Sequence, residues 1–291
     1  SLTSDLPALS KIVTKFNFEA VDGSIAQTTA NLSAVKAVLA GNSNASLTIA
    51  DTTSNLLDIT KAPITAIAGS LLVNGPQSGN VLTVAQLQML ESIKAFNAQG
   101  DVLISDTASN LVATSGLKAI AAAGLGAVVQ VSDNAVVTAA KASILAKIGA
   151  TLAPAASVTV SDTFANLQSL FTASANQMAL ASSTTLSSAQ FTVTGVINAA
   201  NLDALSTLQS TLGSSQQISL AKATVNGSLN YQEASFALSH GYTGAYTVTD
   251  SAANVLGDLQ NGTHSSVYQG ATSVVATGLV SVSTFQTLAQ Q

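Results

Sequence analysis

Four aspartates with the same neighbours are the residues of this sequence whose type and spacing could do chemistry. Each is followed directly by Thr or Ser and, four positions later, by Asn; the pairs are Asp51 and Asn55, Asp106 and Asn110, Asp162 and Asn166, and Asp250 and Asn254. Carboxylate oxygens bind calcium, but this ion takes about six to eight oxygens, usually from clustered carboxylates. One carboxylate per repeated segment is a poor site, so we expect no cofactor and keep calcium at the four aspartates as the alternative.

The same residues also have a structural interpretation. A carboxylate at the end of a strand can accept the free N–H groups of the first helical turn, which stabilises a helix by about 1 kcal/mol. We therefore predict that each repeated Asp is the N-cap of the helix that follows it. Asn is a mediocre helix former. Its recurrence in the helical segment predicts that it bonds backbone groups of the neighbouring repeat and forms a ladder along the stack.

The spacing of the aspartates gives the length of the repeat. The interval from Asp51 to Asp106 is 106 − 51 = 55, and the interval from Asp106 to Asp162 is 162 − 106 = 56. A weaker match at Asp133 divides the second interval into 133 − 106 = 27 and 162 − 133 = 29. The repeat is therefore about 28 residues long, with a β-branched, alternating segment before the Asp and apolar residues at helical spacing after it.

A period of this length, with one strand and one helix, is typical of a solenoid. The predicted fold class is therefore α/β, a solenoid of alternating strands and helices with a parallel sheet on one side; a doubly wound open sheet is the alternative. Residues 1–24 are expected to form an N-terminal cap helix, 25–260 the α/β solenoid repeats, and 261–291 a C-terminal cap or a tail that carries a secretion signal.

Composition restricts the class of protein further. Apolar residues make up 47% and charged residues 8% of the chain, which indicates a folded protein whose surface is rich in Ser, Thr and Asn. There is no Cys and no Arg, the nine Lys are scattered, and the net charge is −5, so we expect no nucleic-acid partner. No run of about 18 apolar residues is present, so we expect no membrane span.

Few other residues could carry catalysis. The sequence has two histidines, His240 and His264, only three Glu, and no nucleophile-elbow, P-loop or HExxH motif. His240 precedes a glycine at an expected helix end, where a cation interacts favourably with the helix dipole. We therefore expect that the protein is not an enzyme and that it has no catalytic residues.

All four tyrosines follow residue 230: Tyr231, Tyr242, Tyr246 and Tyr268. Aromatic rings supply rigid contact area, so this clustering is typical of a surface that binds a sugar or a partner protein. It is equally typical of a distinct core near the carboxy terminus. We keep the four tyrosines as candidate binding residues.

The repeated motif resembles the repeats of large bacterial surface proteins exported by type I secretion, among them hemolysin-type or RTX-associated proteins, adhesins and S-layer-like proteins. The segments that carry the resemblance are LTIADTTSNL from Leu47, VLISDTASNL from Val102, VTVSDTFANL from Val158, YTVTDSAANV from Tyr246, LTVAQL from Leu82 and ANLDAL from Ala200. The resemblance covers about residues 25–260. It implies an extracellular, cell-surface location, an uncleaved carboxy-terminal secretion signal and a structural, adhesive or matrix role. The calcium-binding nonapeptides of the family do not occur in this sequence.

These features together predict a non-enzymatic, secreted bacterial cell-surface or extracellular-matrix protein that acts in self-assembly or adhesion. Its expected partners are further copies of the chain, glycans or a cell surface. A module that binds a carbohydrate or a host protein is one alternative, and an enzyme with an unrecognised site is the other.

Overall fold

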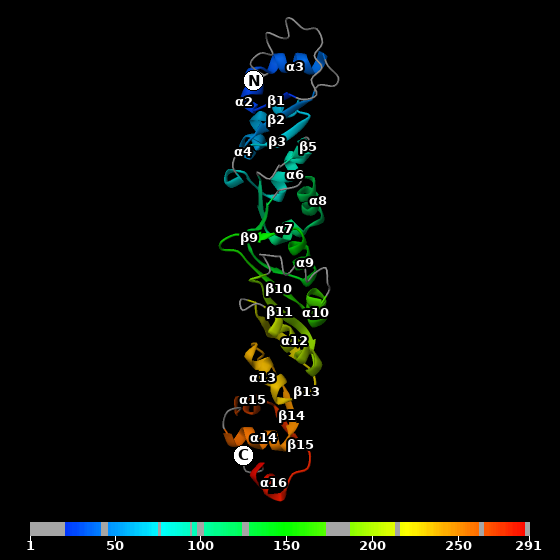
Figure 1. Cartoon of the computed structure of the whole chain (residues 1–291), viewed down its shortest axis with the longest axis vertical. Coiled ribbons are helices and arrows are strands. Elements are labelled where there is room, and N and C mark those ends of the chain that lie inside the picture. The colour runs from blue at the N-terminus through cyan, green and yellow to red at the C-terminus, as the bar shows by residue number, and fades with distance from the viewer. Residues whose placement is uncertain are drawn as a thin grey trace. The chain divides into compact units, whose positions relative to one another are not determined.

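In a computed structural model of the chain, strands and helices alternate along the sequence (Figure 1). The structure describes residues 21–41, 46–74, 77–93, 95–97, 102–123, 128–172, 187–212, 216–261 and 265–288. Every strand pairing with a described register is parallel, which confirms the predicted α/β class. The predicted N-terminal cap helix lies outside the described residues up to residue 20, and Val21–Gly23 form strand β1.

The chain divides into two compact units. The first contains residues 1–135 and 148–156, and the second contains residues 136–147 and 157–291. This division differs from the predicted boundaries at 24 and 260. Strand β15 (Ser273–Thr277) pairs in parallel with β14 (Thr247–Ser251), so the alternation of strands and helices continues past residue 260.

The first unit contains two four-stranded sheets. One has the order β1-β2-β3-β5 and the other the order β4-β6-β7-β9, so the chain passes from β3 in one sheet to β4 in the other and back to β5. The remaining strands are β2 (Leu47–Asp51), β3 (Ser70–Val73), β4 (Val81–Leu82), β5 (Ala95–Asn97), β6 (Leu103–Asp106), β7 (Val128–Val131) and β9 (Thr151–Leu152). The helices are α2 (Ile25–Ala30), α3 (Leu32–Gly41), α4 (Thr53–Leu57), α5 (Ala62–Thr65), α6 (Val84–Ile93), α7 (Ala108–Val112) and α8 (Thr114–Ala122), with short 3-10 helices at Ile59–Lys61 and Gln77–Gly79.

The second unit contains a four-stranded sheet of order β12-β11-β10-β8 and a three-stranded sheet of order β13-β14-β15. The remaining strands are β8 (Asn134–Val137), of which Val136 and Val137 fall in this unit, β10 (Ser157–Thr163), β11 (Gln190–Ile197), β12 (Ile218–Val225) and β13 (Ser228–Leu229). The helices are α9 (Ala139–Lys147), α10 (Phe164–Thr172), α12 (Ala199–Thr211), α13 (Tyr231–Ser239), α14 (Ala252–Asn261), α15 (Ser265–Gly270) and α16 (Val282–Leu288).

The core of each unit is built from alternate strand residues and one face of each helix. In β10 the side chains of Val158 and Val160 are buried while their neighbours are partly exposed, which is the period of two that a strand with one covered face requires. In α6 the buried residues include Leu87 and Leu90, which lie on one face at helical spacing. Alternating β-branched residues therefore form the strands, and leucines three or four positions apart form the buried faces of the helices.

Helix caps recur at the predicted period. The side chains that accept a backbone N–H three residues later belong to Ser24, Thr52, Thr83, Thr107, Thr138, Thr163, Asn198, Asn230 and Ser251. The mean interval between successive caps is (251 − 24)/8, or about 28, which equals the period of the sequence repeat. The described strands nevertheless form four small sheets and not one continuous sheet.

Candidate functional site: the joints between repeats

Each repeated motif lies where a strand ends and a helix begins, but the residue that caps the helix is not the Asp. Thr52, Thr107, Thr163 and Ser251 follow the four aspartates, and each accepts the N–H of the Asn three residues later through its hydroxyl oxygen. The prediction that the Asp caps the helix after it was therefore wrong. The Asp is the last or nearly last residue of its strand, and its carboxylate reaches the neighbouring repeat.

The carboxylate of Asp106 joins two repeats. Its Oδ2 atom accepts the N–H of Val84, the first residue of helix α6 in the preceding repeat, at 2.8 Å. Its Oδ1 atom accepts the N–H of Thr107 at 2.7 Å and the side-chain amide of Asn110 at 2.8 Å. Asp106 is buried. It therefore caps the helix before it, while Thr107 caps the helix after it.

The other three aspartates repeat this arrangement. Their Oδ2 atoms accept the first helical N–H of α2, α9 and α13, from Ile25, Ala139 and Tyr231 respectively. Their Oδ1 atoms accept the N–H of the next residue and the amide of the Asn four positions on. We call this constellation a joint: the Asp, the Thr or Ser after it, the Asn and the capped N–H of the preceding repeat.

The recurring Asn holds the Asp in place. Asn55, Asn110, Asn166 and Asn254 each donate their amide to the Asp of their own repeat at 2.7–2.8 Å. The predicted ladder, in which these side chains bond the backbone of the neighbouring repeat, was wrong. The Asp makes the bond between repeats, and the Asn fixes the rotation of the carboxylate, because it donates to one oxygen and leaves the other to face the preceding helix.

Two further residues perform the capping role that the sequence motif does not mark. Asp133 accepts the N–H of Ala108, the first residue of α7, at 2.9 Å, and the buried Asn80 accepts the N–H of Thr53, the first residue of α4, at 3.1 Å. Asp133 was the weaker match in the spacing. The interval from Asp51 to Asn80 is 80 − 51 = 29, so the period of about 28 would have pointed to Asn80.

The bonds in the joints determine what the carboxylates can do. Burial raises the pKa of Asp162, but the hydrogen bonds from the Asn166 amide and from the N–H groups of Ala139 and Thr163 outweigh burial and leave this pKa below its ordinary value of 3.8. The repeated aspartates end four different strands, β2, β6, β10 and β14, each in a different sheet. The described residues contain no group of three or more His, Asp or Glu side chains placed to hold a metal ion. A calcium ion at one joint would compete with three N–H donors for a single carboxylate.

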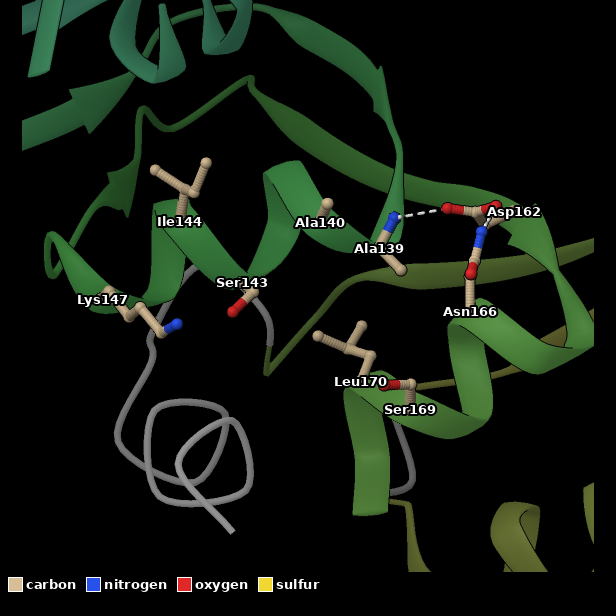
Figure 2. A pocket seen from close by; sticks show the side chains of 9 residues that line it. All are labelled: Ala139, Ala140, Ser143, Ile144, Lys147, Asp162, Asn166, Ser169 and Leu170. Atoms are coloured by element: carbon tan, nitrogen blue, oxygen red, sulfur yellow. Dashed lines mark hydrogen bonds between the residues drawn. The ribbon is translucent and has the colours of Figure 1, made fainter. Parts of the chain in front are cut away.

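An open pocket of about 410 Å³ lies beside the Asp162 joint, between helices α9 and α10 (Figure 2). Ser143, Ile144 and Lys147 approach it from α9, and Ser169 and Leu170 approach it from α10. A second pocket, of about 640 Å³, lies at the equivalent place beside the Asp250 joint. It is lined by Asn230, Tyr231, Gln232, Asp250, Ala253, Asn254, Gly257 and Asp258. Both pockets are therefore the grooves between successive helices, next to the capped N–H.

No family model, curated protein or solved structure matches the chain. The joints and pockets therefore have to be interpreted from their own chemistry. In the parts of the chain that the structure describes, no helix is both long enough and apolar enough to cross a membrane.

Three of the four clustered tyrosines lie in the interior of the second unit. Tyr242, Tyr246 and Tyr268 are each at most 6% exposed. Their hydroxyls donate to Ala245 O at 2.8 Å, to Val267 O at 2.6 Å and to Asp258 Oδ2 at 3.2 Å respectively. Burial is the main cause that raises the pKa of the Tyr268 hydroxyl, and the hydrogen bond to Asp258 raises it further. Their rings fill a core.

Tyr231 is the partly exposed member of the cluster. Its ring centroid lies 5.7 Å from that of Tyr268, and it lines the pocket beside the Asp250 joint. A ligand could therefore reach Tyr231, whereas the other three rings would have to leave the core to bind one.

His240 and Glu91 are ionisable residues outside the joints that could serve in catalysis. His240 caps the carboxyl end of α13, stacks on Phe236 with ring centroids 3.9 Å apart, and has its Nδ1 atom 2.8 Å from Phe236 O. Glu91 in α6, which the sequence did not mark, has a buried Oε1 atom without a hydrogen-bond partner, and burial raises its pKa. Neither residue lines either of the two pockets. His264 lies outside the described residues.

Proposed function

We propose that the protein is a non-enzymatic structural repeat protein of the bacterial cell surface or extracellular matrix, which acts in self-assembly or adhesion. The observation that carries the proposal is that the recurring Asp and Asn side chains are occupied in hydrogen bonds within and between repeats. In each joint both carboxylate oxygens of the Asp accept N–H groups, and the Asn amide donates to the same carboxylate. The recurring Asp and Asn residues therefore lie where their side chains hold successive repeats together.

The proposal includes a solenoid made of repeats of about 28 residues. Each Asp joint links one helix to the strand of the next repeat, and the successive strands β2 and β3, like β6 and β7, pair in parallel. These contacts between repeats that follow one another in sequence support a solenoid. In this solenoid the strands would change from one small sheet to the next along the stack. Small-angle X-ray scattering of the purified chain should give an elongated particle, and a compact, nearly spherical particle would contradict the solenoid.

The extracellular location and type I export rest on the resemblance of the motif. The chemistry of the chain is consistent with them, because it has no Cys and a weakly charged surface. An immunogold label on intact producing cells should place the protein at the cell surface. Label that is found only after the cells are permeabilised would contradict an extracellular role.

Self-assembly is tested on the purified full chain. Multi-angle light scattering over a range of concentrations should show a mass that rises above that of the monomer, and negative-stain electron microscopy should show assemblies. A strict monomer at every concentration, with no binding to cells or to matrix material, would contradict the proposed function.

Carbohydrate binding is the second candidate, and the two pockets favour it. They are open, they recur at equivalent joints, and about half of their lining residues are Asn, Ser, Asp or Gln, whose side chains suit sugar hydroxyls. A glycan array probed with the wild-type chain and with Lys147→Ala and Ser169→Ala variants tests this candidate. Binding that both variants retain unchanged would exclude the pocket beside Asp162 as the site.

A further inference from the structure

The pockets beside the Asp162 and Asp250 joints occupy the same place in two repeats. Each is lined by the first two residues of one helix, by the Asp and the Asn of the joint, and by the residues seven and eight positions after that Asp. The two pockets can therefore be compared position by position. Because the Asp and the Asn are common to both, a difference in binding chemistry has to come from the residues around them.

Three of the shared positions change from apolar to polar or aromatic. The pocket beside Asp162, which Figure 2 shows, has two small side chains and one leucine there, and the pocket beside Asp250 has a phenol ring, an amide and a carboxylate. The corresponding residues are Ala139 and Tyr231, Ala140 and Gln232, and Leu170 and Asp258. The second pocket is also larger, at about 640 Å³ against 410 Å³.

Tyr231 also differs from its counterparts at the other Asp joints. The first helical residues there are Ile25, Val84 and Ala139, and each is at most 5% exposed. Tyr231 is half-buried, with its ring centroid 5.7 Å from that of the buried Tyr268. The packing of a joint therefore does not require an aromatic ring at this position, and part of the Tyr231 ring is left to line the pocket.

The carboxylates of the pocket are held by the protein. Asp258 is half-buried, and its Oδ2 atom accepts the hydroxyl of Tyr268 at 3.2 Å. The Oδ2 atom of Asp250 accepts the N–H of Tyr231 at 3.4 Å, whereas the corresponding bonds at the other three joints are 2.8–3.0 Å long. Asp250 thus engages the helix before it more weakly than the other aspartates do, and its Oδ2 atom has room to accept a shorter bond from a ligand.

The combination of groups in this pocket suits a sugar ring. A pyranose has C–H groups on its faces and hydroxyl groups around its rim, and each hydroxyl both donates and accepts hydrogen bonds. The face of Tyr231 can pack on the C–H groups. Asp258 can accept hydroxyl hydrogens, and the amide of the exposed Gln232 can donate to hydroxyl oxygens. A simple cation would use the ring and the carboxylates but would leave the amide N–H groups without an acceptor.

Charge restricts the sugar further. The residues that line the pocket include two carboxylates, Asp250 and Asp258, and no Lys, and the chain has no Arg. These carboxylates would repel a sugar acid or a phosphorylated sugar. The pocket beside Asp162 has one carboxylate and Lys147 in its lining, so it lacks this bias.

We propose that the pocket beside the Asp250 joint binds an uncharged pyranose, with a C–H face of the sugar on the ring of Tyr231 and its hydroxyl groups bonded to Asp258 and Gln232. We call this site the Tyr231 pocket. The inference rests on the second candidate of the proposed function, carbohydrate binding, and assigns it to one pocket and to one charge class of sugar. A secreted protein would use such a site for adhesion to a glycan.

Calorimetric titration of the full chain tests the class of ligand. The probes are the methyl glycosides of glucose, galactose, mannose and N-acetylglucosamine, with galacturonic acid as the anionic control and choline as the cationic one. At least one of the four uncharged sugars should bind saturably, and both controls should bind at least about tenfold more weakly. Binding of none of the four sugars, or equal or tighter binding of either control, would overturn the proposal.

Gly257 allows the pocket to be filled without disturbing the fold. It lines the pocket from α14, and a Cβ atom at this position meets nothing within 4 Å. Because Leu is a better helix former than Gly, Gly257→Leu should keep or raise the melting temperature. It should lose at least about tenfold in affinity for the sugar that the wild type binds, because its side chain occupies the pocket. Ser169→Leu, at the equivalent position of the other pocket, is the matched control and should bind as the wild type does.

Substitutions of the ring and of the carboxylate separate a sugar from a cation. Tyr231→Ala should lose at least about tenfold in sugar affinity, while Tyr231→Phe keeps the ring and should stay within about threefold of the wild type. Asp258→Asn keeps an oxygen that accepts hydrogen bonds but removes the charge, so it should also stay within about threefold. A tenfold loss in a folded Asp258→Asn variant would show that the pocket selects positive charge and would overturn the proposal.

The outcomes also separate this inference from the proposed function. If folded Tyr231→Ala and Gly257→Leu variants bind the sugar as tightly as the wild type, the Tyr231 pocket is not the site, while carbohydrate binding stands. If the wild type binds none of the sugars but associates in light scattering, the inference and the second candidate both fail, while self-assembly stands.

Discussion

The Asp106 joint at the end of strand β6 and the edge strand β15 are each followed by a helix, but they have opposite environments. At the joint, the strand end is buried and its side chain accepts a helix N–H from the preceding repeat. At the edge, strand β15 is followed by Gly278, Leu279 and α16, and its side chains are exposed. The difference shows that strand and helix patterns do not by themselves bury a repeat.

The largest effect is expected from Asp106→Ala. The substitution removes three hydrogen bonds and leaves the N–H of Val84 at a buried position without its acceptor. Hydrogen bonds to a charged group are worth more than neutral ones, so the variant should lose about 3 kcal/mol of unfolding free energy. Urea denaturation of the purified chain measures it. A loss below about 1 kcal/mol would mean that the joints do not hold the repeats together.

Paired truncations of valine compare the burial of strand β14 with that of strand β15. Val248→Ala, in the fully buried β14, should cost about 2 kcal/mol. Val274→Ala removes the same atoms in the neighbouring strand, where the side chain is 39% exposed, and should cost less than about 1 kcal/mol in the monomer. Thermal melts at low protein concentration make the comparison. Equal losses would mean that β15 is as well covered as β14.

Two substitutions of Asn110 test whether its side chain bonds Asp106, as in the structure, or backbone groups of the neighbouring repeat. Asn110→Ala loses one amide bond and should cost about 1 kcal/mol. Asn110→Asp places a second carboxylate against Asp106 and should cost about twice as much, since like charges at this distance repel. Melting temperatures at pH 7 rank the variants. A larger loss for Asn110→Ala than for Asn110→Asp would show that the Asn110 side chain does not hold the Asp106 carboxylate.

A smaller effect is expected from Asp133→Asn. Asp133 accepts the first N–H of α7 with one oxygen, and Asn80 already performs the same role for α4 with an amide oxygen. The substitution should therefore cost less than about 0.5 kcal/mol, whereas Asp106→Asn, which loses the use of one of two occupied oxygens, should cost about 1 kcal/mol or more. Denaturant midpoints compare the two variants side by side.

The smallest effect is the pH dependence of the Asp162 joint. Because hydrogen bonds leave the folded-state pKa of Asp162 below the unfolded value of 3.8, this joint stabilises the fold fully at neutral pH and loses that contribution as pH falls through the folded-state pKa. Unfolding free energy measured from pH 6 to pH 3 should fall more steeply in the wild type than in Asp162→Asn. If the two variants lost unfolding free energy in parallel as the pH fell, Asp162 would not contribute to the destabilisation at low pH.

Several features of the fold could be predicted from the sequence because they depend on neighbouring residues. The repeat period, the strand before each Asp and the helix after it all follow from local patterns, and the observed caps keep that period. The cap was placed one residue too early, on the Asp. The signal for the correct residue was present, since Thr or Ser with a polar residue three positions later, as in Thr107 and Asn110, is typical of a helix start.

The bonds between repeats could not be predicted in the same way. The Asp or Asn side chains of the joints and the N–H groups that they accept are 19 to 27 residues apart in sequence. The register of the parallel strands determines which N–H comes within reach, and no local pattern encodes that register. The tyrosines show the same limit, because their clustering in sequence is equally consistent with a surface and with the core that Tyr242, Tyr246 and Tyr268 form.

The sequence by itself therefore determined the α/β class, the length of the repeat and the location of the polar positions that recur. The tertiary structure alone decided that Asp106 caps the helix before it, that the strands divide among four small sheets, and that β15 is left exposed. The physical reason is that propensity and capping act over a few residues, whereas strand pairing and burial depend on which distant segment lies alongside.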